Sequence, residues 1–427
     1  MDIIKKYIYK IGQKLRNPSL KSEYDFLLKS DKWSKEQLVN YQIVKCKELL
    51  SFAYKYSFYY RNLFDNIGFD VTKFNSLSDL KKIPILEKQT LLEKGEEIKT
   101  NYPFKKLFFS ETSGTSGQCL QFFRNEEWDS ANRAAMFRGY NWYNVNPWDR
   151  NGYFWGYNID KSQKFKTALL DFLQNRFRLF SYDSSHIKKF ARKAKSATFI
   201  SGYSSMIFET AKLINSLPKK QYHLKMIKGT SEKIYDSYQE EVGKAFGLKM
   251  ISEYGSCESG IIAYECPNGN MHICMEHVIV EEINDEIVVT NLLSKSFPII
   301  RYKLGDYIKL ASPDFKCACG RQHTVILDVL GRVGSSIIGK RSKFPSLTFY
   351  YVFKNLASRK GIYLNYQAEQ NKIGEVILRI EQNRPELLSL LQHELFKYFK
   401  KEILFEIKWG CKLHKMNGKL KDFISTI

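Results

Sequence analysis

The amino-acid sequence predicts an α/β protein with two domains. A large N-terminal domain of mixed or parallel sheets and helices is expected before a small, mobile α+β C-terminal domain. Between residues 101 and about 330, short apolar strands alternate with helical stretches, which is typical of a parallel sheet. A strand, helix and strand pattern recurs near the C-terminus. At roughly 150 residues per domain, the 427 residues fit two or three domains.

These patterns divide the chain into three parts. Residues 1–100 are expected to form the helical N-terminal part of the large domain, residues 101–332 its core, and residues 333–427 the small domain. The sequence contains neither an internal repeat nor a low-complexity linker. The boundary between the two domains is therefore expected to be a tight hinge.

The first helix is expected within residues 3–16 and is amphipathic. Most of its Lys and Arg residues lie outside an apolar stripe, although Lys14 intrudes on it. Such a helix could lie on an anionic membrane. The favoured alternative is an ordinary amphipathic helix that docks on the domain. The stripe consists of Ile3, Ile4, Tyr7, Ile8, Ile11 and Leu15.

A second helix has a clear start signal. Ser34 can accept a hydrogen bond at the helix N-terminus, and Gln37 at the third position completes a capping box. The apolar pattern predicts that this helix continues to Tyr56.

Strands are predicted from short apolar runs that are spaced by helical stretches. In the middle of the chain they are Lys106–Phe109, Phe154–Tyr157, Phe199–Ser201, Leu224–Lys228 and Leu248–Glu253. Tighter alternation predicts antiparallel strands of a smaller sheet or barrel at His272–Glu282, Glu286–Asn291 and Tyr307–Leu310. In the last part, residues 362–380 and 402–408 are expected to form strands, and Pro385–Lys401 a helix.

The chain is strongly basic, with a formal net charge of +22. Such an excess attracts polyanions: nucleic acid, an anionic membrane or phosphorylated small molecules. The absence of a compact basic tract or a known nucleic-acid motif argues against nucleic acid. No run of about 18 apolar residues occurs, and the start lacks the pattern of a secretion signal. A cytoplasmic protein is therefore expected, with peripheral contact at the inner membrane face as an option.

A loop rich in Ser, Thr and Gly is the strongest local signal for chemistry. Hydroxyl side chains alternate with Gly114 and Gly117 in residues 110–117, so backbone N–H and side-chain O–H donors could surround a polyphosphate. The spacing matches neither common nucleotide-binding glycine motif. Taken alone, the loop could equally be a simple turn.

Cysteine and histidine residues form a second candidate site. Cys266 and His272 are followed, after 44 intervening residues, by Cys317 and Cys319. Three thiols with one imidazole suit tetrahedral zinc. Cys274 and His277 could substitute, and iron could replace zinc. The alternative is a set of buried thiols with a surface histidine.

Further short motifs follow in a fixed order along the chain. Tyr254-Gly255-Ser256-Cys257-Glu258 comes after a predicted strand, then residues 302–306, Gly331-Arg332 and Asn417-Gly418-Lys419. With the Ser/Thr/Gly loop, this set resembles the AMP-forming adenylating superfamily. It is most similar to the phenylacetate–CoA ligase and CapK-like branch, whose members include capsule-biosynthesis proteins. The resemblance extends over nearly the whole chain.

The resemblance implies a role for each motif in binding MgATP. The β- and γ-phosphates would be held by a loop made of Thr112, Ser113, Gly114, Thr115, Ser116 and Gly117. The segment Gly229, Thr230 and Ser231 would form a wall of the adenine pocket, with Tyr254 and Gly255 beside the base. Glu258 would bind Mg²⁺, and Asp306 would accept hydrogen bonds from the ribose hydroxyls.

The same resemblance implies catalytic roles for Glu258, Arg332 and Lys419. Arg332 would lie beside Asp306 at the hinge, and Lys419 would enter with the small domain to stabilise the charge that develops in the transition state. Two positions depart from the family pattern: Gln118-Cys119 replaces an x-Pro pair, and Val333-Gly334-Ser335 lacks the usual acidic hinge residue.

The activity that follows is that of an AMP-forming ligase. It would activate a carboxylic acid as an acyl-adenylate and transfer the acyl group to coenzyme A or an amine. The resemblance implies capsular or surface polysaccharide biosynthesis as the context, with a nucleotide sugar or lipid-linked glycan among the candidate acceptors. The competing interpretations are a non-catalytic, ATP-binding scaffold and a membrane-apposed protein.

Overall fold

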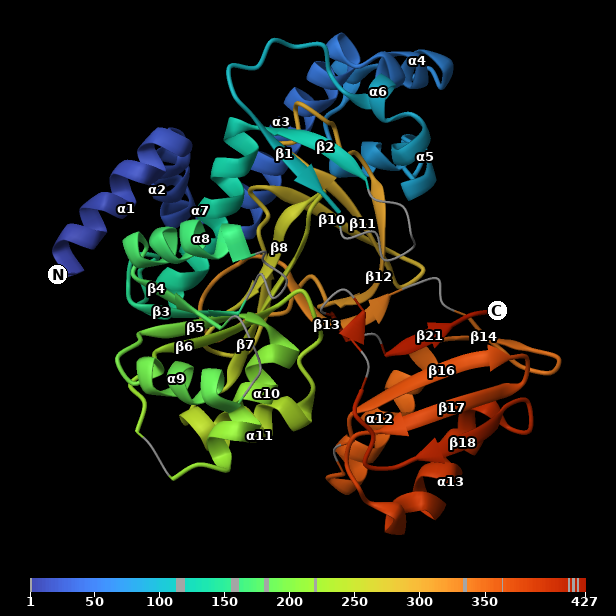
Figure 1. Cartoon of the computed structure of the whole chain (residues 1–427). Coiled ribbons are helices and arrows are strands. Elements are labelled where there is room, and N and C mark those ends of the chain that lie inside the picture. The colour runs from blue at the N-terminus through green and yellow to red at the C-terminus, as the bar shows by residue number, and fades with distance from the viewer. Residues whose placement is uncertain are drawn as a thin grey trace.

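The computed structural model describes the chain except residues 1, 113–119, 155–160, 180–183, 219–220, 333–335, 363, 414, 417–418 and 421. A large domain, in which helices surround a broad sheet, lies beside a smaller C-terminal sheet with two helices (Figure 1). This arrangement confirms the predicted fold class. Among the helices of the described residues, none combines the length and apolar character that a membrane span requires.

Helices dominate the first hundred residues. They are α1 (Asp2–Arg16), α2 (Leu20–Ser30), α3 (Lys35–Tyr56), α4 (Phe58–Asn66), α5 (Lys88–Glu93) and α6 (Gly95–Ile98), with 3₁₀ turns at Val71–Lys73 and Leu77–Lys82. The predicted start and end of α3 are confirmed, because Ser34 and Gln37 form a complete capping box. Buried side chains such as Leu50 and Phe64 pack with Ile299 and Ile300, which lie just before strand β12 (Tyr302–Leu310).

The large domain is built on an 11-stranded sheet. Its strand order is β10-β11-β12-β13-β9-β8-β7-β6-β5-β3-β4. The parallel half consists of β3 (Asn151–Phe154), β4 (Arg176–Arg178), β5 (Phe199–Tyr203), β6 (Met226–Thr230) and β7 (Met250–Ser256). The helices of this half are α7 (Glu126–Trp142), α8 (Lys161–Leu173), α9 (Ser184–Ala194), α10 (Ser204–Asn215) and α11 (Asp236–Phe246).

The antiparallel half continues the same sheet. It consists of β8 (Gly260–Glu265), β9 (Met271–Ile273), β10 (Val278–Ile283), β11 (Glu286–Asn291), β12 (Tyr302–Leu310) and β13 (Val325–Arg332). The predicted strands are antiparallel, as expected, but they do not form a smaller sheet of their own, because β8 turns back from β7 and hydrogen-bonds to it directly.

One predicted strand lies outside this sheet. The Lys106–Phe109 run becomes β1 (Leu107–Glu111), which pairs with β2 (Gln121–Asn125) as a hairpin instead of joining the parallel strands. A hairpin can form here because only the residues between Glu111 and Gln121 separate the two strands.

The C-terminal part has its own apolar core. A four-stranded sheet in the order β18-β17-β16-β21 packs against two helices through side chains that include Phe349, Leu378 and Phe399. The larger elements are α12 (Leu347–Lys360), β16 (Tyr366–Lys372), β17 (Glu375–Ile380), α13 (Leu388–Phe399) and β18 (Leu404–Lys408). The shorter ones are β14 (Ser336–Ile338), β15 (Lys343–Pro345), a 3₁₀ turn (Pro385–Leu387), β19 (Lys415–Met416), β20 (Lys419–Leu420) and β21 (Phe423–Ser425).

Candidate active site

The carboxyl ends of the central parallel strands carry the segment predicted to bind adenine. Tyr203, Thr230 and Glu253 are direct neighbours across β5, β6 and β7. Ligands of open α/β sheets bind beyond this end of the strands. Ser231, just after β6, has a left-handed backbone with φ of 65°, a conformation that costs energy in a residue with a side chain.

Packing and hydrogen bonds around the end of β6 constrain the backbone at this edge of the sheet. A Cβ atom at Gly229 would come within 2.5 Å of the Ser204 hydroxyl oxygen, so the position has no room for a side chain. The Glu232 carboxylate accepts a hydrogen bond of 2.8 Å from the Ser205 backbone N–H at the start of α10. A carboxylate at a helix N-terminus stabilises the helix, so Glu232 helps to hold α10 in place.

Tyr254 and Asp306, predicted from separate motifs, are in contact. The Tyr254 hydroxyl donates a hydrogen bond of 2.8 Å to Asp306 Oδ2. Three strands lie between β7 and β12 in the sheet order, and in a flat sheet they would separate the two residues by roughly 19 Å. The antiparallel half must therefore curl back toward β7. Such a curl is typical of a barrel, which was one of the two predicted alternatives.

Arg332 is the ladder partner of Asp306 across β12 and β13. The backbones of Arg332, the predicted hinge residue, and Asp306, the predicted ribose-binding residue, are therefore neighbours in the sheet. The Arg332 side chain lies outside the described part of the chain.

Glu258 lies in the turn that follows β7, and its side chain is buried. Its backbone carbonyl accepts a hydrogen bond of 3.1 Å from the Asn291 side chain, and its carboxylate lies 3.4 Å from the Tyr302 hydroxyl. The neighbouring Cys257 thiol contacts the Glu111 carbonyl oxygen at 3.4 Å. This contact places the end of β1 beside the Glu258 turn.

The base of the Ser/Thr/Gly loop is held by Thr112. Its N–H donates to the Leu120 carbonyl and its hydroxyl oxygen accepts from the Leu120 N–H, both at 3.0 Å. Since Thr112 follows Glu111, the loop starts and ends next to the turn that carries Glu258. Ser113, Gly114, Thr115, Ser116 and Gly117 themselves lie outside the described residues.

Lys419 is placed by its backbone in β20, opposite Met416 in β19. Its side chain lies outside the description. Elsewhere in this part of the chain, the Tyr235 hydroxyl donates a hydrogen bond to the half-buried Asp422 carboxylate, and Lys212 forms an ion pair of 2.9 Å with Glu381. These contacts join α10 and the start of α11 to the small domain, and no sequence signal indicated them.

Cys266, His272, Cys317 and Cys319 converge as predicted. Their ligand atoms all lie within 4.8 Å of one another, and the Cys266 and Cys317 sulfurs are 3.7 Å apart. A tetrahedral zinc ion with Zn–S bonds of about 2.3 Å would place its sulfurs roughly 3.8 Å apart. We call these four residues the Cys/His centre, and their spacing fits a zinc ion.

The imidazole of His272 is prepared for metal binding. Its Nδ1 lies 3.3 Å from the His323 carbonyl oxygen, which directs Nε2 toward the Cys319 sulfur at 3.2 Å. Burial lowers the pKa of His272 to about 4, so the ring is neutral near pH 7. A neutral imidazole, oriented through its second nitrogen, is the usual form of a histidine ligand.

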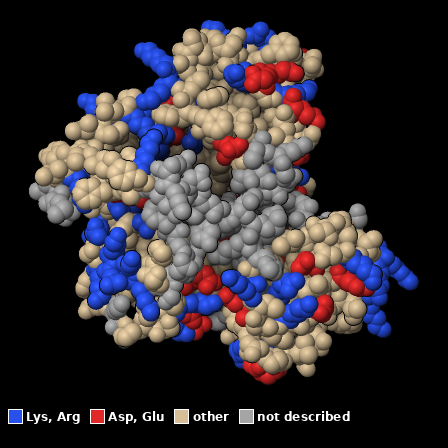
Figure 2. All heavy atoms as spheres, viewed as in Figure 1, with Lys and Arg blue, Asp and Glu red and all other residues tan. Residues whose placement is uncertain are grey.

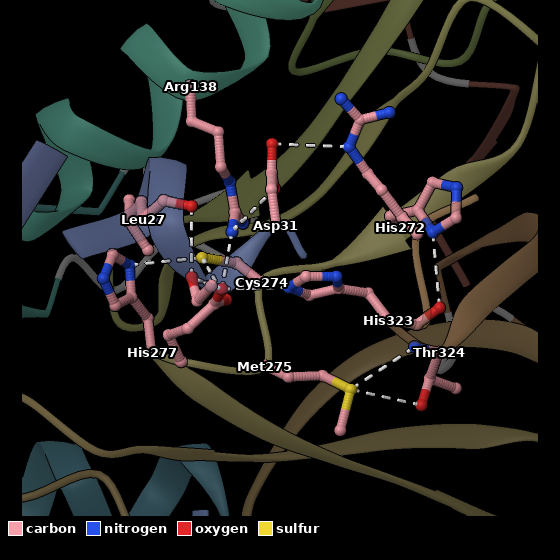
Figure 3. Close-up of polar contacts among 12 residues, drawn as sticks. Leu27, Asp31, Arg138, His272, Cys274, Met275, His277, His323 and Thr324 are labelled. Carbon is pink, nitrogen blue, oxygen red and sulfur yellow. Dashed lines mark hydrogen bonds and ion pairs between the residues drawn. The ribbon is translucent and has the colours of Figure 1, made fainter. Parts of the chain in front are cut away.

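A second buried polar group lies beside the Cys/His centre (Figure 3). Glu276 is fully buried and accepts hydrogen bonds from Arg138 Nη1 at 2.7 Å, from His323 Nε2 at 2.9 Å and from the Ser30 hydroxyl. We call Ser30, Arg138, Glu276 and His323 the Glu276 cluster. It joins α2 and α7 to the two segments of the chain that follow His272 and Cys319.

Cys274 and His277, considered as substitute zinc ligands, belong to this second region. The Cys274 sulfur lies 3.3 Å from His277 Nδ1, and His277 Nε2 lies 2.8 Å from the Glu23 carboxylate. Burial opposes a charged imidazole, but Cys274 and Glu23 outweigh it and raise the pKa of His277 to about 10. His277 is therefore paired with a thiol and a carboxylate of its own.

Comparison with known proteins shows what the whole chain is similar to. No family model matches the chain. The protein CapK of Staphylococcus aureus is 19% identical over 414 residues, which cover 90% of this chain and 88% of CapK. The crystal structure of a 2-hydroxyisobutyryl-CoA ligase in the postadenylation state, with 2-HIB-AMP, has a TM-score of 0.69 at 15% identity. The match covers 90% of this chain and 88% of the ligase.

The same ligase, with 2-HIB-AMP and CoA in the thioesterification state, has a TM-score of 0.61 at 15% identity. That match covers 92% of this chain and 91% of the ligase. The chain therefore has the fold of this ligase over about 90% of its length, and its sequence is similar to that of CapK.

Proposed function

We propose that this chain, which has the adenylating superfamily fold, is an ATP-dependent, AMP-forming carboxylate ligase. The observation that carries the proposal is the hydrogen bond between Tyr254 and Asp306, at the same edge as the Glu258 turn and the base of the Thr112 loop. Residues from three motifs that are far apart in the sequence meet there, and this meeting supports a site for adenine, ribose and triphosphate.

The reaction has two steps. An oxygen of the substrate carboxylate attacks the α-phosphorus of ATP, the bond to the β-phosphate oxygen breaks, and pyrophosphate leaves. The acceptor, coenzyme A or an amine, then attacks the acyl carbonyl carbon, loses a proton and displaces AMP. Lys419 and Arg332 would offset negative charge in the first step, and Glu258 would hold Mg²⁺. When bound, Mg²⁺ neutralises the triphosphate.

The small domain, residues 333–427, is proposed to be the mobile lid that carries Lys419. The Cys/His centre is proposed to hold structural zinc, because its four donors leave no position for a substrate. The relation to CapK supports capsular or surface polysaccharide biosynthesis as the context. We further propose that residues 3–16 make peripheral contact with the inner face of the membrane, from the cytoplasmic side.

The decisive experiment measures pyrophosphate release with MgATP and pooled carboxylates, with and without coenzyme A. The pool contains aryl acetates, fatty acids, amino acids and UDP-uronic acids. Release that depends on an acid establishes adenylation, and a further increase with coenzyme A but not with amines identifies a thioester product. ATP binding without release from any acid would favour the scaffold alternative.

A further inference from the structure

Helix α1 is turned so that its apolar stripe faces solvent. Ile4, Ile11 and Leu15 are 66%, 59% and 74% exposed, and Tyr7 is similarly open. An amphipathic helix on a globular protein normally buries this stripe against the core. The sequence-based expectation of an ordinary docked helix was therefore wrong about the direction of the stripe, although the helix does lie against the domain.

Polar and aromatic contacts hold the opposite face of α1 on the protein. Lys5 is buried, with its Nζ donating to Asn175 Oδ1 at 3.1 Å and lying 4.7 Å from the centre of the Phe172 ring. Tyr9 packs against Phe137 and Trp148. At the end of the helix, Lys106 Nζ donates to the backbone carbonyls of residues 15 and 16. The contacts that hold α1 on the protein therefore do not bury its apolar stripe.

Helix α8 repeats this arrangement next to α1. Phe165 is 79% exposed, and Leu169 and Phe172, four and seven residues later, are also more than half exposed. The inner face of α8 instead buries Asp171, which forms a two-pronged ion pair of 2.9 Å with Arg178. The two helices are in contact, and Lys5 of α1 lies over Phe172 of α8. We call the exposed apolar side chains of these two neighbouring helices the α1/α8 surface.

The charge around the α1/α8 surface has one dominant sign. Figure 2 shows mainly residues other than Lys, Arg, Asp and Glu over α1, and Lys and Arg gathered over α9. In α1, α8 and α9 the acidic residues are Asp2 and Asp171, and Asp171 is paired. The exposed basic residues of α9 are Lys188, Lys189, Arg192 and Lys193.

We propose that the α1/α8 surface docks on an anionic lipid bilayer. Exposed large apolar side chains enter the boundary between headgroups and acyl chains, while nearby Lys and Arg attract anionic headgroups. The setting, a ligase that works beside a membrane, rests on the function proposed above, whereas the surface itself does not. The small domain lies on the other side of the molecule from α1 (Figure 1), so docking would leave it free to move.

The test is sedimentation of the full chain with vesicles of phosphatidylcholine, with and without phosphatidylglycerol. We expect binding to the anionic vesicles, weaker binding without phosphatidylglycerol, and loss of binding in ~1 M NaCl, where the screening length is ~3 Å. Ile4→Ser with Ile11→Ser, and separately Phe165→Ser with Leu169→Ser, should each reduce binding about tenfold or more, since each apolar side chain loses its membrane burial.

The matched control is Phe396→Ser with Leu404→Ser, a pair of exposed apolar residues in the small domain that should leave binding unchanged. Equal binding by the α8 variant and the original chain, or no binding to either vesicle, would overturn the proposal. So would a dimer in light scattering that both variants convert to monomers, because a second copy would then cover the surface. Binding to vesicles is measured without ATP. A protein that sediments with the vesicles but has no ligase activity would therefore refute the proposed function and leave the proposed membrane docking intact.

Discussion

The candidate active site and the Cys/His centre lie at opposite ends of β7 and β8. At the active-site end, Tyr254 and Asp306 are half-buried, one hydrogen bond joins them, and Ser231 has a strained backbone. At the other end, Cys266 and His272 are buried, and neighbours orient the ligand set. The first region is suited to a ligand that enters and leaves, and the second to an ion that stays. The comparison predicts that one region governs activity and the other stability.

The largest effect should follow from breaking the Cys/His centre with Cys317→Ser and Cys319→Ser. Structural zinc contributes roughly 10 kcal/mol, and whole domains are stable by only about 5–15 kcal/mol. We therefore expect loss of bound zinc and of most of the stability of the large domain, measured by elemental analysis and thermal unfolding. Cys411→Ser, in the small domain, is the control and should retain the metal. A double variant that melts like the original chain would show that the centre holds no structural ion.

The Glu276 cluster should come next. Glu276→Gln removes the nearer of the two carboxylates that pair with the buried Arg138 and leaves only Asp31, at 3.5 Å. Loss of a partner from a buried ion pair costs about 3–5 kcal/mol. Urea unfolding measures this change in the free energy of unfolding. Glu240→Gln, which breaks an exposed pair with Lys244, should cost less than about 1 kcal/mol. Equal effects of the two substitutions would contradict a structural role for the cluster.

At the active-site end, Lys419→Ala should change activity and leave stability intact. Loss of a charge that acts only in the transition state lowers kcat about 10²–10³-fold, equivalent to ~3–4 kcal/mol. ATP binding and the melting temperature should be unchanged. The control is Lys412→Ala, an exposed lysine in the same domain. An unchanged rate of pyrophosphate release in the Lys419 variant would remove this residue from the proposed mechanism.

The smallest effect is expected from Tyr254→Phe. The substitution removes one hydrogen bond to Asp306, worth about 1 kcal/mol, and keeps the ring that would contact adenine. The KM for ATP should rise a few-fold with little change in the melting temperature. A large drop in stability would instead mean that this bond holds the curled sheet together, and the contrast between the two regions would fail.

Local signals in the sequence predicted the parts of the structure that depend on neighbouring residues. The Ser34 capping box, the strand Glu286–Asn291 and the Cys/His set are such cases. The curl that joins Tyr254 to Asp306 could not be predicted, because it depends on pairing between strands far apart in the chain. Periodicity likewise revealed the apolar stripe of α1 but not its direction, which contacts such as Lys5 with Asn175 determine.

Strand β13 connects the two regions directly, since Val325 pairs with His272 at its start and Arg332 pairs with Asp306 at its end. The chain then continues through residues 333–335 into the small domain. Rotation of the small domain would therefore twist β13 at its Arg332 end. The Val325 end of β13 pairs with His272 of the Cys/His centre and would resist that twist. If the centre holds an ion and the chain is the proposed ligase, the identity of that ion should affect how fast the ligase moves between its two steps, while the affinity for ATP stays the same.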